Sequence, residues 1–262
     1  MTRRIVVKVG SNVLTRPDGK LDVTRVSALV DELAWLRGRG CEVILVSSGA
    51  VASGHGELGD DPNLDSVEQR QLYSAVGQVK LINTYYTLFR EYGIKVAQVL
   101  TVKENFTSPR EYANLRGCMA VMLESGVLPV VNENDTVSVT ELMFTDNDEL
   151  SGLMAKMMQA DTLILLTNVD GIYDGEPGDP SARLLRRVEA GGDVSGYVRE
   201  CKSSFGRGGM AAKCGIAMGT AAAGIRVLIA NGRRDGILKD LMLHPDDTPH
   251  TEFEPAAVTG KA

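Results

Sequence analysis

The fold of this chain is decided by the stretch Ile5-Val6-Val7-Lys8-Val9-Gly10-Ser11-Asn12. Its apolar, β-branched residues predict a buried strand that ends at the glycine. The lysine is the exception, because an ammonium group is costly to bury unless it meets an anion. Lys8 therefore marks either an edge strand, from which its side chain reaches water, or a strand that presents it to an anion. The glycine favours the second interpretation, since backbone N–H groups can approach a phosphate closely there.

The same short apolar runs continue along the chain and alternate with segments of helical period. Near-continuous apolar strands joined by crossover helices predict an α/β fold, a three-layer αβα sandwich around a mostly parallel open sheet. The other expected strands lie at 41–46, 94–102, 127–131, 162–167 and 225–230. The expected helices lie at 22–39, 66–92, 112–123, 147–159 and 210–223.

Three segments depart from this alternation. The polar, alternating stretch 137–144 predicts a hairpin. The stretch 54–59 matches the G-x-G-x-x-G spacing of dinucleotide-binding turns, but no strand directly precedes it, so we expect a surface loop. The stretch 245–262 has neither helical nor strand period, so we expect a C-terminal tail after a single domain over 1–244.

Composition and charge exclude several classes of protein. With 262 residues, 44% of them hydrophobic, the chain is long and apolar enough for a large core. Its 28 Lys and Arg against 34 Asp and Glu give a net charge of −6, so no nucleic-acid partner is expected. No apolar run approaches the roughly 20 residues of a membrane span and no leader precedes the first strand, so we expect a cytoplasmic protein without a membrane partner. The four cysteines are far apart and near none of the three histidines, so no metal site is expected.

Polar and glycine-rich clusters follow predicted strands or open predicted helices, and the carboxyl ends of strands in a parallel sheet are where ligands bind. Each cluster alone is explained as a helix cap or a turn. Together, the two clusters of acidic and amide residues suggest a site for a small molecule with an ammonium and carboxylates, and the glycine-rich cluster before a helix suggests an anion cradle. The clusters lie at 47–54, 132–136, 145–149 and 206–213.

Six motifs in this order resemble the amino-acid kinase family, and within it the branch that phosphorylates glutamate. The motifs are KVGSNVLT at 8–15, SSGAVASG at 47–54, NEND at 132–135, DND at 146–148, TNVDGIY at 167–173 and GGMAAK at 208–213. The resemblance covers residues 1 to about 243. It implies the amino-acid kinase fold, with an acceptor half over about 1–158 and a nucleotide half over about 159–244.

The activity implied by the resemblance is ATP-dependent phosphorylation of the γ-carboxylate of L-glutamate to L-glutamyl 5-phosphate, the first step of proline biosynthesis. Mg²⁺ would be carried mainly by the ATP phosphates. The implied catalytic residues are Lys8, Asp148 and Lys213, with Asp148 fixing the two ammonium groups. The implied glutamate-binding residues are Ser48, Gly49, Asp135 and Asn147. The implied ATP-binding residues are Lys8, Gly10, Ser11, Thr167, Asn168, Arg207, Gly208, Gly209, Met210, Ala211, Ala212 and Lys213.

The resemblance also implies partners. They are L-glutamate as substrate, L-proline as feedback inhibitor, further copies of the chain in a dimer or tetramer, and a glutamyl phosphate reductase that takes up the product. Many bacterial relatives continue into a C-terminal PUA domain, and this chain resembles a short form that ends where that domain begins.

The chemistry agrees with this interpretation and leaves alternatives. A carboxylate acceptor is already ionised at neutral pH, so its phosphorylation needs positioning and charge neutralisation rather than a general base. Within the family, N-acetylglutamate, aspartate or UMP is the alternative acceptor, against which the Ser11-Asn12 pair and the 132–135 segment argue. A catalytically silent amino-acid sensor is the alternative from another class, and the retention of both lysines and Asp148 argues against it.

Overall fold

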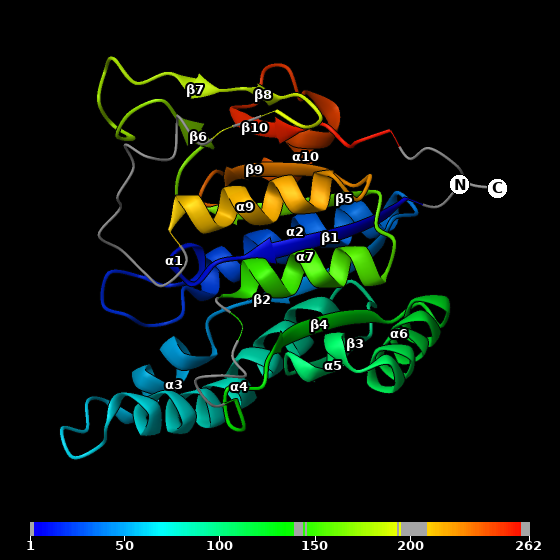
Figure 1. Ribbon diagram of the computed structural model, residues 1–262. Helices are drawn as coiled ribbons and strands as arrows, with labels where there is room; N and C mark the ends of the chain where they lie inside the picture. The colour runs from blue at the N-terminus through cyan, green and yellow to red at the C-terminus, as the bar shows by residue number, and fades with distance from the viewer. Residues whose placement is uncertain (1–2, 139–143, 145, 193, 195–208, 258–262) are drawn as a thin grey trace.

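The computed structural model describes residues 3–138, 144, 146–192, 194 and 209–257 (Figure 1). The centre of the molecule is an eight-stranded sheet with the order β3-β4-β2-β1-β5-β9-β10-β8. These strands are β1 (Arg4–Val9), β2 (Glu42–Ser47), β3 (Val96–Thr101), β4 (Leu128–Glu133), β5 (Thr162–Thr167), β8 (Arg187–Val188), β9 (Arg226–Asn231) and β10 (His250–Phe253). A separate two-stranded ribbon pairs β6 (Ile172–Tyr173) with β7 (Leu184–Leu185).

Across the sheet from β3 through β4, β2, β1 and β5 to β9, each strand is parallel to the next. The prediction of a mostly parallel sheet is therefore confirmed. β1 lies in the middle of the sheet, where Lys8 is in register with Val46 of β2 and with Leu165 of β5. Because both sides of β1 are paired, the edge-strand interpretation of Lys8 is wrong. Its ammonium group has to find an anion inside the molecule.

The far edge of the sheet corrects another prediction. β10 runs antiparallel to β9 and parallel to β8, so the expectation that 245–262 contains no strand is wrong. Four residues are too few to show a period in the sequence, and β10 is held by pairing with β9 on one side and β8 on the other. The hairpin expected at 137–144 lies mostly outside the described residues.

Helices cover both faces of the sheet. The helices are α1 (Ser11–Leu14), α2 (Val23–Gly38), α3 (Ala50–Leu58), α4 (Ser66–Arg90), α5 (Glu104–Thr107), α6 (Pro109–Glu124), α7 (Asn147–Met157), α9 (Met210–Ala221) and α10 (Ile237–Leu243). The odd-numbered residues of β1 share one apolar core with α2, α4 and α10. Val6 belongs to the other core, with α6, α7 and α9, and Figure 1 shows α7 and α9 side by side across the central strands. No helix in the described ranges combines the length and apolar composition that a membrane span needs.

α3 replaces the surface loop expected at 54–59, so that prediction is wrong. Its glycines serve a close crossing with α4 instead of a dinucleotide turn. A Cβ on Gly54 would lie 1.9 Å from the carbonyl oxygen of Tyr73, and one on Gly77 would lie 1.8 Å from that of Ala50. This crossing holds the first half of α4 beside the carboxyl ends of β2 and β4, where the site lies.

We expect Gly77→Ala to lower the free energy of unfolding by about 2–3 kcal/mol or more, because the added methyl group forces the two helices apart. Urea denaturation measures the change. Gly117→Ala in α6 is the matched control, since nothing lies within 4 Å of a Cβ there. It should be neutral or stabilising by up to about 1 kcal/mol. Equal urea midpoints for the two variants would contradict the close crossing.

Candidate active site

The first feature of the site is a cluster of ion pairs that joins three elements. Lys8 faces the same side of the sheet as Val6, and its Nζ lies 2.7 Å from Oδ1 of Asp148 in the first turn of α7. Lys213, in the first turn of α9, donates to the other oxygen, Oδ2. We call these three residues the lysine–aspartate cluster. The structure brings together the three residues expected to be catalytic, and their roles stay predictions.

Burial dominates the electrostatics of the cluster. It lowers the pKa of Lys8, and the Asp148 carboxylate opposes that shift. Burial also disfavours the charge on Asp148, which is only 1% exposed, but the two ammonium groups outweigh it and lower the pKa of Asp148 to about 2. The two cations and one anion of the cluster sum to +1, and the carboxylate of Asp146 lies near enough to interact with both lysines. An excess buried charge is unfavourable until an anion approaches, so the cluster suits a phosphate or carboxylate ligand.

The position of Asp148 depends on a helix cap. Asp146 is the N-cap of α7, and its Oδ1 accepts hydrogen bonds from the backbone N–H groups of Asp148, at 2.9 Å, and Glu149, at 3.2 Å. Acidic residues at this end of a helix also interact favourably with its dipole. Burial, and next the charge of Asp148, raise the pKa of Asp146. The helix start predicted at 147 is therefore confirmed, with the residue before it as the cap.

A cavity of about 590 Å³ opens on the cluster, and we call it the α9 cavity. Many of the residues expected to bind ATP line it. They are Lys8, Gly10, Ser11, Thr167, Asn168, Gly209, Met210 and Lys213. Ala211 and Ala212 belong to α9 but not to the described wall of the cavity, and Arg207 and Gly208 lie outside the described residues.

A second cavity of about 710 Å³ lies on the α4 side, and we call it the α4 cavity. All four residues expected to bind glutamate line it: Ser48, Gly49, Asp135 and Asn147. The two cavities share wall residues, which are Ser11, Ser48, Asp146 and Asn147. The lysine–aspartate cluster lines the α9 cavity, beside the shared wall to which Asp146 and Asn147, the two residues before Asp148, contribute.

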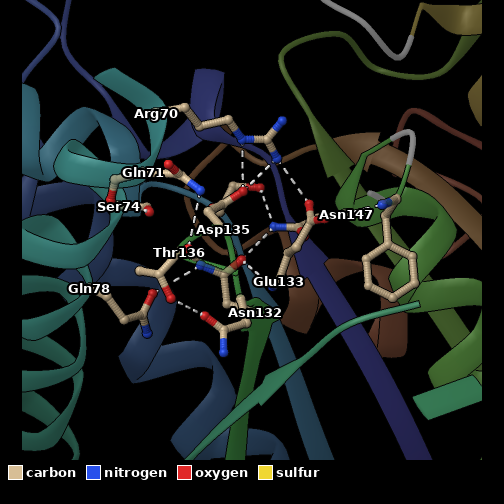
Figure 2. A network of polar contacts seen from close by, with 12 residues as sticks. Arg70, Gln71, Ser74, Gln78, Asn132, Glu133, Asp135, Thr136 and Asn147 are labelled. Atoms are coloured by element: carbon tan, nitrogen blue, oxygen red, sulfur yellow. Dashed lines mark hydrogen bonds and ion pairs between the residues drawn. The ribbon is translucent and has the colours of Figure 1, made fainter. Parts of the chain in front are cut away.

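Ser48 differs from its expected local role. A serine before α3 was expected to cap that helix, but the N-cap is Gly49, with φ +106°, and no side chain caps it. Instead, Oγ of Ser48 accepts a hydrogen bond of 2.9 Å from Nδ2 of Asn147. The same Nδ2 donates to Oδ1 of Asn132, whose own amide donates to Gln78 (Figure 2). An uncharged amide network thus crosses the floor between the two cavities.

Sequence reasoning missed two charged residues of the α4 cavity, Arg70 and Glu133. Nε of Arg70 donates to Oδ1 of Asp135 at 2.8 Å, and its Nη2 donates to Oε2 of Glu133 at 3.0 Å (Figure 2). Burial raises the pKa of Glu133 and of Asp135, and Arg70 opposes both shifts. Glu133 lies inside a motif already singled out, so its place at the strand end could have been found. Nothing in the polar sequence around Arg70 distinguishes it from a solvated helix residue.

The profile of the Amino acid kinase family matches residues 3–231. The chain belongs to the amino acid kinase family. Among similar proteins, the glutamate 5-kinase of Bacteroides thetaiotaomicron is 63% identical over 97% of this chain and 70% of its own length. The glutamate 5-kinase of Chlorobaculum tepidum is 48% identical over 91% of this chain and 66% of its own length. This amino acid kinase thus spans about two thirds of these relatives.

Solved structures of other amino acid kinases share the fold. The carbamate kinase of Giardia lamblia bound to AMP-PNP superimposes with a TM-score of 0.67 over 97% of this chain and 99% of that one, at 16% identity. A UMP kinase of Bacillus anthracis gives 0.66 over 97% of both chains, also at 16% identity. At identities this low, the likeness shows a shared fold and says nothing about the acceptor substrate. The predicted three-layer amino-acid kinase fold is confirmed.

We expect Asp148→Asn to lower the free energy of unfolding by about 3 kcal/mol or more at pH 7, because it leaves two buried ammonium groups facing each other. In the parent, the pKa of Asp148 falls from an ordinary 3.8 in the unfolded chain to about 2 in the folded protein. The stability contributed by the Asp148 carboxylate is therefore present above about pH 4 and is lost as the pH drops towards 2. The variant should therefore lose less stability than the parent across that window in urea denaturation.

The control is Asp235→Asn, which removes an ion pair with Arg25 from a carboxylate that is 89% exposed. The urea midpoint of this control should match that of the parent at pH 7 and across the acid window from about pH 4 towards pH 2. If Asp148→Asn behaved like this control, the buried cluster would not be an important source of stability.

Proposed function

We propose that this amino acid kinase transfers the γ-phosphoryl group of ATP to the γ-carboxylate of L-glutamate, forming L-glutamyl 5-phosphate and ADP. The observation that carries the proposal is the lysine–aspartate cluster in the α9 cavity, beside the wall shared with the α4 cavity. The α9 cavity combines the cluster with a helix N-terminus and glycines, which suits a nucleotide triphosphate. The names of the relatives support glutamate as the acceptor.

The transfer is a direct displacement. An oxygen of the γ-carboxylate attacks the γ-phosphorus, and the bond from that phosphorus to the β,γ-bridging oxygen breaks as ADP leaves. The acceptor is already an anion, so no general base is needed. Lys8 and Lys213 neutralise charge on the transferring group and on the leaving oxygen, while Asp148 holds their ammonium groups in fixed positions.

The charges of the α4 cavity favour one orientation of glutamate. Asp135 and Glu133 line the cavity, the backbone N–H of Glu133 donates to Asn132, and Asn132 accepts from Asn147, the residue before Asp148. An ammonium group prefers the two carboxylates and a γ-carboxylate prefers the lysine–aspartate cluster. Aspartate is one methylene shorter and spans this distance less well, and N-acetylglutamate lacks the ammonium group.

Mg²⁺ fits this arrangement as an ion that arrives on ATP. Within the described ranges, no three His, Cys, Asp or Glu side chains are grouped so that they could hold a metal ion. The buried carboxylate nearest the lysines, Asp148, is already bound by both of them. Mg²⁺ readily keeps phosphate and water ligands, so the phosphates of the nucleotide would supply its ligands.

The family resemblance supports three further proposals. L-Proline inhibits by competing for the α4 cavity, the chain assembles with copies of itself, and a glutamyl phosphate reductase consumes the product. Acyl phosphates hydrolyse readily, so rapid reduction protects the product.

The function is tested by ADP release with L-glutamate, L-aspartate, N-acetyl-L-glutamate and UMP, each with and without L-proline. We expect turnover on L-glutamate alone, a hydroxamate when hydroxylamine traps the product, and suppression by L-proline. Turnover on another acceptor would keep the kinase and change its substrate. Binding of glutamate without turnover on any acceptor would favour the sensor.

Lys8→Ala and Lys213→Ala should each lower kcat by about 100-fold or more, because each removes a cation from the transferring phosphoryl group. Lys156→Ala, an exposed lysine of α7, is the matched control and should leave kcat unchanged. Steady-state ADP release measures all three variants. Near-normal turnover without Lys8 or Lys213 would remove that lysine from the mechanism.

A further inference from the structure

We propose that Arg70 is a positioning residue that selects acceptors with a free α-ammonium group. It holds Glu133 and Asp135 ionised and side by side, so that together they bind one ammonium group. The identity of the acceptor rests on the proposed function, whereas the selection of a free amine rests on the geometry of the α4 cavity.

Arg70 forms ion pairs with both Glu133 and Asp135, and we call these three residues the clamp. Its guanidinium reaches from α4 to the carboxyl end of β4, where Nε and Nη2 contact Oδ1 of Asp135 at 2.8 and 2.5 Å. Nη2 also lies 3.0 Å from Oε2 of Glu133. The two carboxylate side chains are 8% and 4% exposed, and that of Arg70 is 26% exposed. One planar fork therefore fixes two buried carboxylates at the wall of the cavity.

The charge balance of this clamp matches one ammonium group. Burial raises the pKa of Glu133, and the nearby charge of Asp135 raises it further. Burial also raises the pKa of Asp135, and Arg70 opposes the rise in both residues. One cation and two anions give −1, which a single ammonium neutralises. Without the guanidinium, the pKa of both carboxyl groups would rise further, and a protonated carboxyl would weaken the preference of the cavity for a cation.

Other titratable groups line the same cavity and set its background charge. They are Asp146 at the start of α7, His55 and Tyr73 on α3 and α4, and Asp60 after α3. His55 pairs with Asp60 at 2.7 Å, away from the clamp. Across the amide network, Lys8 and Lys213 are paired with Asp148. These ion pairs do not involve Asp135 or Glu133, and among the described residues Arg70 is the cation paired with both carboxylates.

The test measures binding of L-glutamate and N-acetyl-L-glutamate by calorimetry without ATP, at pH 7 and at about pH 8.5, where the amine of free glutamate is still largely protonated. Arg70→Gln should weaken L-glutamate binding about tenfold or more at pH 7 and recover most of it at the higher pH, as the carboxylates ionise again. Its preference for L-glutamate over N-acetyl-L-glutamate should fall about tenfold at pH 7. Arg70→Lys should keep the parent's flat pH dependence.

Arg90→Gln, at the exposed end of the same helix, is the matched control and should behave like the parent. The proposal is overturned if Arg70→Gln binds L-glutamate within twofold of the parent at pH 7. It is also overturned if its loss is equal at both pH values and shared by Arg70→Lys, since a merely structural role predicts that result. A parent that binds L-glutamate selectively but releases no ADP would overturn the kinase function and support this inference.

Discussion

The candidate active site of this protein depends on a single buried carboxylate. Asp148 binds the ammonium groups of Lys8, on the central strand β1, and of Lys213, in α9. Lys213 lies 65 residues after Asp148 in the chain. Each of the three charges would be unfavourable alone at this depth, and together they still leave one positive charge in excess. The contact therefore joins β1, α7 and α9, and its excess positive charge suits an anionic ligand.

The remaining charges of the site complement that cluster. In the α4 cavity, Arg70, Glu133 and Asp135 carry one negative charge in excess, and neutral amides of Asn132 and Asn147 lie between the two groups. This arrangement of charge matches that of the zwitterionic acceptor in the proposed function. Most of the positioning needed for phosphoryl transfer can thus come from preorganised charge, without movement of a catalytic base.

Parts of the site were legible in the sequence because they follow strands. Lys8 stands out as the one charge in an apolar strand, Asp135 and Ser48 belong to polar clusters at predicted strand ends, and Asn147 belongs to one that opens a predicted helix. Arg70 had no such signal, because a single arginine on a long polar helix looks the same whether it meets water or two buried carboxylates. The spacing at 54–59 was misinterpreted for a related reason. Gly54 is needed for the close packing of α3 against α4 and not for a local turn.

The sequence by itself determined the main alternation of strands and helices and the mostly parallel sheet, and it predicted the edge of that sheet for the site. These features follow from hydrophobic period and from turn residues, which act over a few neighbouring positions. The tertiary structure alone decided the pairing of β10 with β9, the close crossing of α3 with α4 and the grip of Arg70 on β4. Each of these joins residues that are distant in the chain, and a local pattern carries no record of a partner that arrives only on folding.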